Sequence, residues 1–124
     1  MIPEPLQTPS PTTGRGNGFP QQVIHMTQEI AQRFPAGRAV VTRGVYEKIE
    51  SGELDVDQVC DIIIRHLSGD WGDVCDEDRQ ANEDALDEDD PGRLHSVYNI
   101  GRTTYWVITE WDRSATTVLL PEEY

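Results

Sequence analysis

The C-terminal third of the chain places three β-type segments close together, and this arrangement leaves few folds open to it. The segments are rich in Val, Ile, Thr, Tyr and Trp, and they cover residues 94–99, 103–110 and 115–120. The turns between them are only a few residues long, and connections that short can join antiparallel strands but not parallel ones. The sequence therefore predicts a three-stranded antiparallel meander.

Residue alternation in the middle segment separates the two faces of this sheet. Tyr105, Val107 and Thr109 fall on one face, whereas Trp106 and Ile108 fall on the other. One face must pack on helices to form a core, which predicts an α+β fold of two layers. The sequence also allows one extra short strand near residues 38–42, in addition to the meander.

The strongest helix signal covers residues 55–67. Asp55 is a good N-cap, and Gln58 stands three residues later, as in a capping box. The predicted apolar face of this helix consists of Val56, Val59, Cys60, Ile63 and Leu67. Arg65 and His66 would complement the C-terminal end of the helix dipole, and Gly69 would end the helix.

Weaker signals predict three more helices. Thr42 can cap a short helix that carries Val45, Tyr46 and Ile49 and ends at Gly52. Residues 76–86 form a mostly solvated helix, and residues 20–34 form an amphipathic one. The Pro-rich and Gly-rich residues 1–19 have no apolar period and are predicted to be a disordered tail, which leaves residues 20–124 as a single domain.

The charge of the chain narrows its possible partners. It has 23 acidic and 10 basic residues in 124, for a formal net charge of -13. Such a charge opposes direct binding to nucleic acid or to anionic lipid, and it favours a protein partner with a basic surface. No basic segment followed by an apolar run begins the chain, and no run of 18 apolar residues occurs. We therefore expect a cytoplasmic protein, with Cys60 and Cys75 kept as buried or semi-buried thiols.

The acidic segment over residues 70–90 is the most unusual feature of the sequence. It is either a solvated surface that keeps the protein soluble, or a surface that binds a basic partner by standing in for DNA phosphates. Trp71, between two glycines, fits a core position better than a ligand contact. The candidate partner-binding residues are Asp70, Trp71, Asp73, Asp76, Glu77, Asp78, Glu83, Asp84, Asp87 and Glu88.

Metal and catalytic alternatives have weaker support. The acidic segment lacks the ligand spacing and the central glycine of an EF-hand calcium loop. A zinc site would have to use Cys60, His66, Cys75 and His95, which show no short Cys-x-x-Cys spacing. A metal-dependent or enzymatic centre in the turn would instead use His66, Asp70, Asp73 and Cys75. We expect no cofactor and no enzyme, and the exposed strand edges leave a homodimer open.

From about Gly37 to its end, the chain resembles a family of small proteins carried on plasmids and integrative elements of proteobacteria. The residues that carry this resemblance are Arg65–His66, Gly69–Asp73, Glu77–Asp78, Asn82, Trp106–Glu110, Asp112–Ser114, Thr116–Thr117 and Leu119–Tyr124. Some members are labelled plasmid-related or restriction-associated. The chain is too short for a methyltransferase domain and lacks a glycine-rich cofactor loop, so the label implies no such activity. It also departs from the family by a longer N-terminal segment and by Arg43, where a proline is common.

The resemblance implies cargo of a mobile element, and small acidic cargo of that kind often interferes with host defence. Together with the acidic segment, this gives the functional expectation. We expect a non-enzymatic accessory protein that binds a protein partner, as a DNA mimic that inhibits a restriction or CRISPR-type defence factor.

Overall fold

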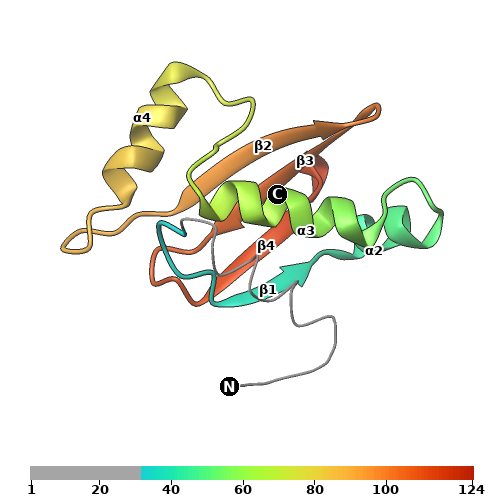
Figure 1. Ribbon diagram of the computed structural model, residues 1–124, viewed down its shortest axis with the longest axis horizontal. Helices are drawn as coiled ribbons and strands as arrows, with labels where there is room; N and C mark the ends of the chain where they lie inside the picture. Colours follow the sequence, from blue (N-terminus) through green and yellow to red (C-terminus); the bar gives the residue numbers. More distant parts are fainter. Residues whose placement is uncertain (1–31) are drawn as a thin grey trace, which may run out of the picture. The chain divides into compact units, whose positions relative to one another are not determined.

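The computed structural model describes residues 32–124, and these form one compact unit with a four-stranded sheet (Figure 1). The strands are β1 (Arg38–Val41), β2 (Leu94–Ile100), β3 (Thr103–Thr109) and β4 (Ala115–Leu119). The helices are α2 (Arg43–Glu50), α3 (Val56–Leu67), α4 (Asp76–Ala85) and a final 3-10 turn, η2 (Pro121–Glu123). In Figure 1, α3 lies across one face of the sheet, and α4 lies beside β2 on the side away from β1.

The sheet is mixed, so the prediction of a three-stranded antiparallel meander was incomplete. The strand order is β1-β4-β3-β2, and β4, β3 and β2 pair antiparallel as their short turns require. β1 adds a fourth strand that runs parallel to β4, with Arg38 opposite Ala115 and Val41 opposite Val118. This parallel pair is possible because α2, α3, α4, β2 and β3 lie between β1 and β4 in the chain.

Local capping signals set the helix ends as the sequence predicts. Asp55 and Gln58 form both bonds of the capping box at the start of α3, and the Thr42 side chain accepts the amide of Val45 at the start of α2. At α4 the capping group is the thiol of Cys75, which accepts the amide of Asp78. The first turn of α4 is entirely acidic, which the positive end of the helix dipole favours.

The main core lies between the sheet and the two helices α2 and α3. It consists of Val45, Leu54, Val59, Ile62, Tyr98, Tyr105, Val107, Val118 and Leu120. Of the two faces that the alternation separates, the one with Tyr105, Val107 and Thr109 is the inward face of β3, since all three are fully buried. A second apolar cluster joins the start of the described chain to α4 and contains Phe34, Trp71, Ala85 and Leu94.

The predicted apolar face of α3 is rotated relative to the observed one. The buried residues are Val59, Ile62 and His66, whereas Val56 is 59% exposed and Cys60 is also exposed. Helical spacing explains the difference, because Val59, Ile62 and His66 share one stripe that excludes positions 56 and 60. Cys75 is exposed as well, so the prediction of two buried or semi-buried thiols was wrong.

The predicted tail over residues 1–19 lies outside the described residues, as does the predicted helix from residue 20 to residue 31. The last residues of that predicted helix, 32–34, are not helical. Within residues 32–124, no helix has the length and apolar character needed to cross a membrane.

Candidate partner-binding surface

Trp71 is a core residue, and its position organises the turn that follows α3. The side chain is fully buried, stacks on Phe34 and contacts the edge of His66. Next to it, Gly72 has a φ of 75°, and a Cβ atom there would lie 2.0 Å from the carbonyl oxygen of Val97. Only glycine fits this close approach. The buried Trp71 side chain therefore packs beneath the turn that carries Asp70 and Asp73.

Glu83 also holds the fold together. Its carboxylate accepts the indole N–H of Trp71 at 2.9 Å and forms a two-point ion pair with Arg33 at 2.8 and 2.9 Å. These bonds, the one from Arg33 first, lower the pKa of Glu83. Glu83 thus links α4 to the start of the described chain, and its charge is already paired.

Asp70 and Asp73 are exposed, and both form bonds within the chain. Asp70 pairs with Arg65 at 2.8 Å, and this ion pair lowers the pKa of Asp70. Asp73 accepts the side-chain amide of Asn99 at 2.9 Å. These bonds tie the turn to α3 and β2, so neither carboxylate is wholly available to a partner.

His66 is buried in a chain of polar groups and does not act as an exposed helix-capping cation. Its Nδ1 lies 2.6 Å from Ser96 Oγ, and its Nε2 lies 2.9 Å from Thr109 Oγ1. Thr116 donates to the Ala36 carbonyl at 2.7 Å, so the Thr109 hydroxyl must donate to Thr116 and accept from His66. This order places the imidazole proton on Nε2 and makes Nδ1 the acceptor of the Ser96 hydroxyl.

This network leaves His66 unsuited to act as an acid, a base or a metal ligand. Burial, with smaller effects from His95 and Arg113, lowers the pKa of His66 to about 3, so the ring is neutral. Both ring nitrogens already have partners. In addition, no three His, Cys, Asp or Glu side chains within residues 32–124 are arranged to hold a metal ion. The geometry therefore gives no support to a centre built from His66, Asp70, Asp73 and Cys75, or to a zinc site that adds Cys60 and His95.

The remaining candidate residues are all exposed, and together they are here called the acidic face. It consists of Asp76, Glu77, Asp78 and Asp84 of α4 with Asp87 and Glu88 of the following loop, all of them exposed. Asn82 and Ala85 are the buried residues of α4, so the acidic positions 76, 77 and 84 point away from the sheet. None of the six forms an ion pair within the described residues.

Asn82 fixes the position of the acidic face relative to the sheet. Its side-chain amide donates to the His95 carbonyl at 2.8 Å, and its oxygen accepts the His95 amide at 3.0 Å. Two residues further along β2, Val97 forms backbone hydrogen bonds with Trp71 and Asp73. The outer edge of β2 is therefore occupied by α4 and the turn, as exposed strand edges commonly are.

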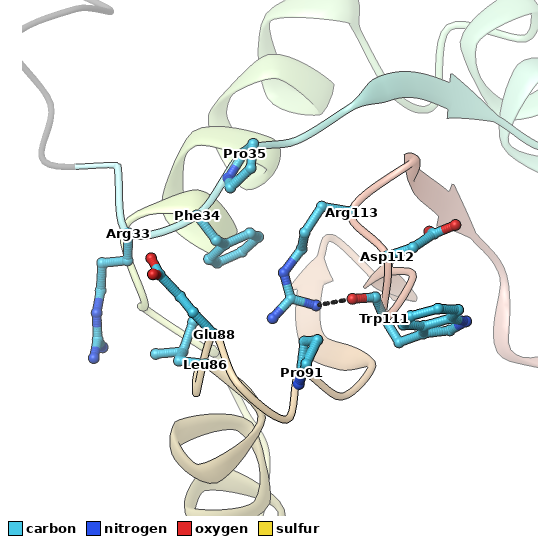
Figure 2. A pocket seen from close by; sticks show the side chains of 9 residues that line it. All are labelled: Arg33, Phe34, Pro35, Leu86, Glu88, Pro91, Trp111, Asp112 and Arg113. Atoms are coloured by element: carbon cyan, nitrogen blue, oxygen red, sulfur yellow. Dashed lines mark hydrogen bonds between the residues drawn. The ribbon is translucent and has the colours of Figure 1, made fainter.

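A cavity of about 260 Å³, here called the Trp111 pocket, adjoins the acidic face (Figure 2). It is lined by Arg33, Phe34, Pro35, Leu86, Glu88, Pro91, Trp111, Asp112 and Arg113. Only Glu88 among these was a sequence candidate. Figure 2 shows the Arg113 guanidinium between the Phe34 ring and Pro91. The signal that could have found the pocket is Trp111, a large aromatic in a polar turn.

Among the described residues, Arg113 is the single non-glycine residue with a positive φ, 61°. Its guanidinium donates to the carbonyls of Gly92 at 2.6 Å and Ala85 at 2.7 Å, and to those of Glu110 and Trp111 at longer range. Arg113 therefore joins the C-terminal end of α4 to the β3–β4 turn and holds the Trp111 pocket open.

Comparison of the chain with protein-family models, curated proteins and solved structures finds no match.

Proposed function

We propose that this chain is a non-enzymatic accessory protein of a mobile element that binds a basic protein partner through the acidic face. The partner is one whose basic groove normally holds DNA, such as a restriction or CRISPR-type defence factor. The single observation that carries the proposal is that some carboxylates of the acidic segment form ion pairs within the fold and others do not. Among residues 32–124, Glu83 and Asp70 have ion pairs, whereas the carboxylates of the acidic face have none.

Electrostatics supports this function over a purely solubilising one. Arg79 is the single basic residue of α4, and it donates to the carbonyl of Gly72 in the turn that precedes the helix. The outward positions therefore present one sign of charge along about two helical turns. A row of like charges costs stability through repulsion, and a partner lined with Lys and Arg would relieve that cost.

The test compares two variants that change the charge equally. The first neutralises the acidic face with Asp76→Asn, Glu77→Gln, Asp78→Asn and Asp84→Asn, and it keeps Glu83 because that residue bonds Trp71. The control makes the same charge change on α2, α3 and the C-terminal turn, with Glu50→Gln, Asp57→Asn, Asp61→Asn and Glu122→Gln, all exposed.

Each protein is used to capture partners from a proteobacterial lysate, and duplex DNA is then used to release them. We expect a DNA-binding protein that the wild type and the control capture, that DNA releases, and that the acidic-face variant loses. Circular dichroism melting checks that both variants stay folded. Equal capture by the two variants would reduce the acidic face to a solvated surface.

A further inference from the structure

We infer that the Trp111 pocket receives one arginine side chain of the partner and so anchors the acidic face on it. This inference rests on the proposed function and deepens it. The cavity volume of about 260 Å³ lies below the range of about 300–1,000 Å³ typical of cofactor and drug-sized ligand sites. A volume of this size suits a single long side chain.

The apolar part of the lining fits the stem of such a side chain. Phe34 comes from the segment before β1, Leu86 and Pro91 come from the segment between α4 and β2, and all three form walls of the cavity (Figure 2). Trp111 is 61% exposed, which is unusual for a residue that normally buries most of its area. Tryptophan is also the residue most often found at the centre of binding energy in protein interfaces. The indole is thus the natural contact for an incoming group.

The charges around the cavity favour a cation as the incoming head group. Two of the lining residues are basic, and both are already engaged. Arg33 pairs with Glu83, and Arg113 donates to four carbonyls, including that of the last residue of α4. Within residues 32–124, the carboxylates of Glu88 and Asp112 form no ion pair, and neither does Arg113, so these two carboxylates face one lining cation that has no acidic partner.

Two neighbouring features strengthen this preference. Asp87, Asp89 and Asp90 of the adjoining loop are exposed and add negative charge. Asp112 accepts the Ser114 hydroxyl and amide, which lowers its pKa and keeps it ionised. Arginine fits better than lysine, because its planar guanidinium stacks on an indole while donating to a carboxylate. The lining therefore offers an aromatic face, an apolar wall and carboxylates that form no ion pair within residues 32–124, as an arginine side chain requires.

The pocket is tested with a short peptide on the full chain labelled with ¹⁵N. The probe is acetyl-Gly-Arg-Gly-amide, and its counterparts carry citrulline or glutamate in place of arginine. The indole N–H of Trp111 reports binding at the pocket, and the buried indole of Trp71 serves as the internal reference. We expect a saturable shift of the Trp111 signal with the arginine peptide, with half-saturation on the order of millimolar.

Paired variants separate a site from general attraction to an acidic protein. Glu88→Gln with Asp112→Asn should raise the half-saturation concentration at least about threefold, whereas Asp57→Asn with Asp61→Asn should leave it unchanged. An equal response to the citrulline peptide would overturn the inference, as would equal effects of the two variant pairs. A saturable shift with the glutamate peptide alone would assign the cavity to an anion at Arg113 and would also overturn it.

Failure of the pocket can be told apart from failure of the proposed function. The acidic-face variant Asp76→Asn, Glu77→Gln, Asp78→Asn and Asp84→Asn leaves all nine lining residues intact. If the arginine peptide binds but this variant captures partners as the wild type does, the pocket stands and the proposed function fails. If this variant loses the partner while Trp111→Ala keeps wild-type affinity for it, the proposed function stands and the pocket fails.

Discussion

At the scale of single residues, the buried rings of Trp71 and His66 stabilise the fold, and the sequence predicts the burial of only one of them. Trp71 is predicted to fit a core position, because glycines flank it in a turn. The burial of His66 is not predicted, because a histidine near a helix end is usually assigned to the dipole. Its polar partners Ser96, Thr109 and Thr116 occupy inward strand positions, which only the observed strand register reveals.

Trp71→Ala should destabilise the fold strongly. The side chain is fully buried and its N–H bonds Glu83, so truncation leaves a cavity and removes one hydrogen bond, at a cost of about 3–5 kcal/mol. The free energy of unfolding in urea measures this cost. Trp111→Ala is the matched control, because an exposed indole should change stability by less than about 0.5 kcal/mol. Similar losses in the two variants would contradict the assignment of Trp71 to the core.

His66 should make stability depend on pH. Its pKa is lowered to about 3 in the fold, and in the unfolded chain it lies near the ordinary value of about 6.5. The unfolded chain therefore takes up the proton first, so the stabilisation is complete above about pH 6.5 and is lost as pH falls toward 3. At about 1.4 kcal/mol per pH unit, we expect a loss of about 2 kcal/mol between about pH 7 and pH 5.

Urea unfolding at these two pH values checks this expectation on the wild type and on His66→Gln. The variant should be less stable at about pH 7, and it should lose less stability than the wild type on acidification. Carboxylates with lowered pKa values and His95 remain in both proteins, so the difference between them isolates His66. An equal loss in both proteins would show that His66 does not carry the pH dependence.

At the scale of elements, local signals predict α2, α3, α4 and the antiparallel strands. The capping box of Asp55 and Gln58 and the alternation along β3 are examples, since both depend only on neighbouring residues. The parallel pairing of β1 with β4 is different, because Arg38 and Ala115 are far apart in the chain. The Trp111 pocket was missed for the same reason: its lining comes from three distant segments.

Asn82→Ala should loosen α4 from the sheet. The substitution removes both bonds to the His95 backbone and leaves a donor and an acceptor without partners at the β2 edge, at a cost of about 2 kcal/mol. Hydrogen exchange should quicken at the amide of His95. Gln80→Ala, on the exposed side of the same helix, is the control and should leave that amide protected. Unchanged exchange in Asn82→Ala would mean that other contacts hold α4 in place.

At the scale of the whole molecule, the acidic residues that give the net charge of -13 fall into groups with different roles. Composition alone predicts an acidic surface, but it cannot separate carboxylates that pair within the fold from those that do not. The structure makes that separation: Glu83 and Asp70 are paired, whereas the acidic face is open to solvent. The Trp111 pocket lies at one end of this face and shares Glu88 with it.

The most direct test of the account is displacement of DNA from the partner that the chain captures. A fluorescent duplex is bound to that partner at low salt, and its anisotropy is followed as the chain is added. We predict that the wild type and the Glu50, Asp57, Asp61 and Glu122 control displace the duplex equally. The variant that neutralises Asp76, Glu77, Asp78 and Asp84 should need at least about tenfold more protein, about 1.4 kcal/mol of binding free energy. Equal displacement by both variants, or none by the wild type, would contradict the claim that the acidic face takes the place of DNA.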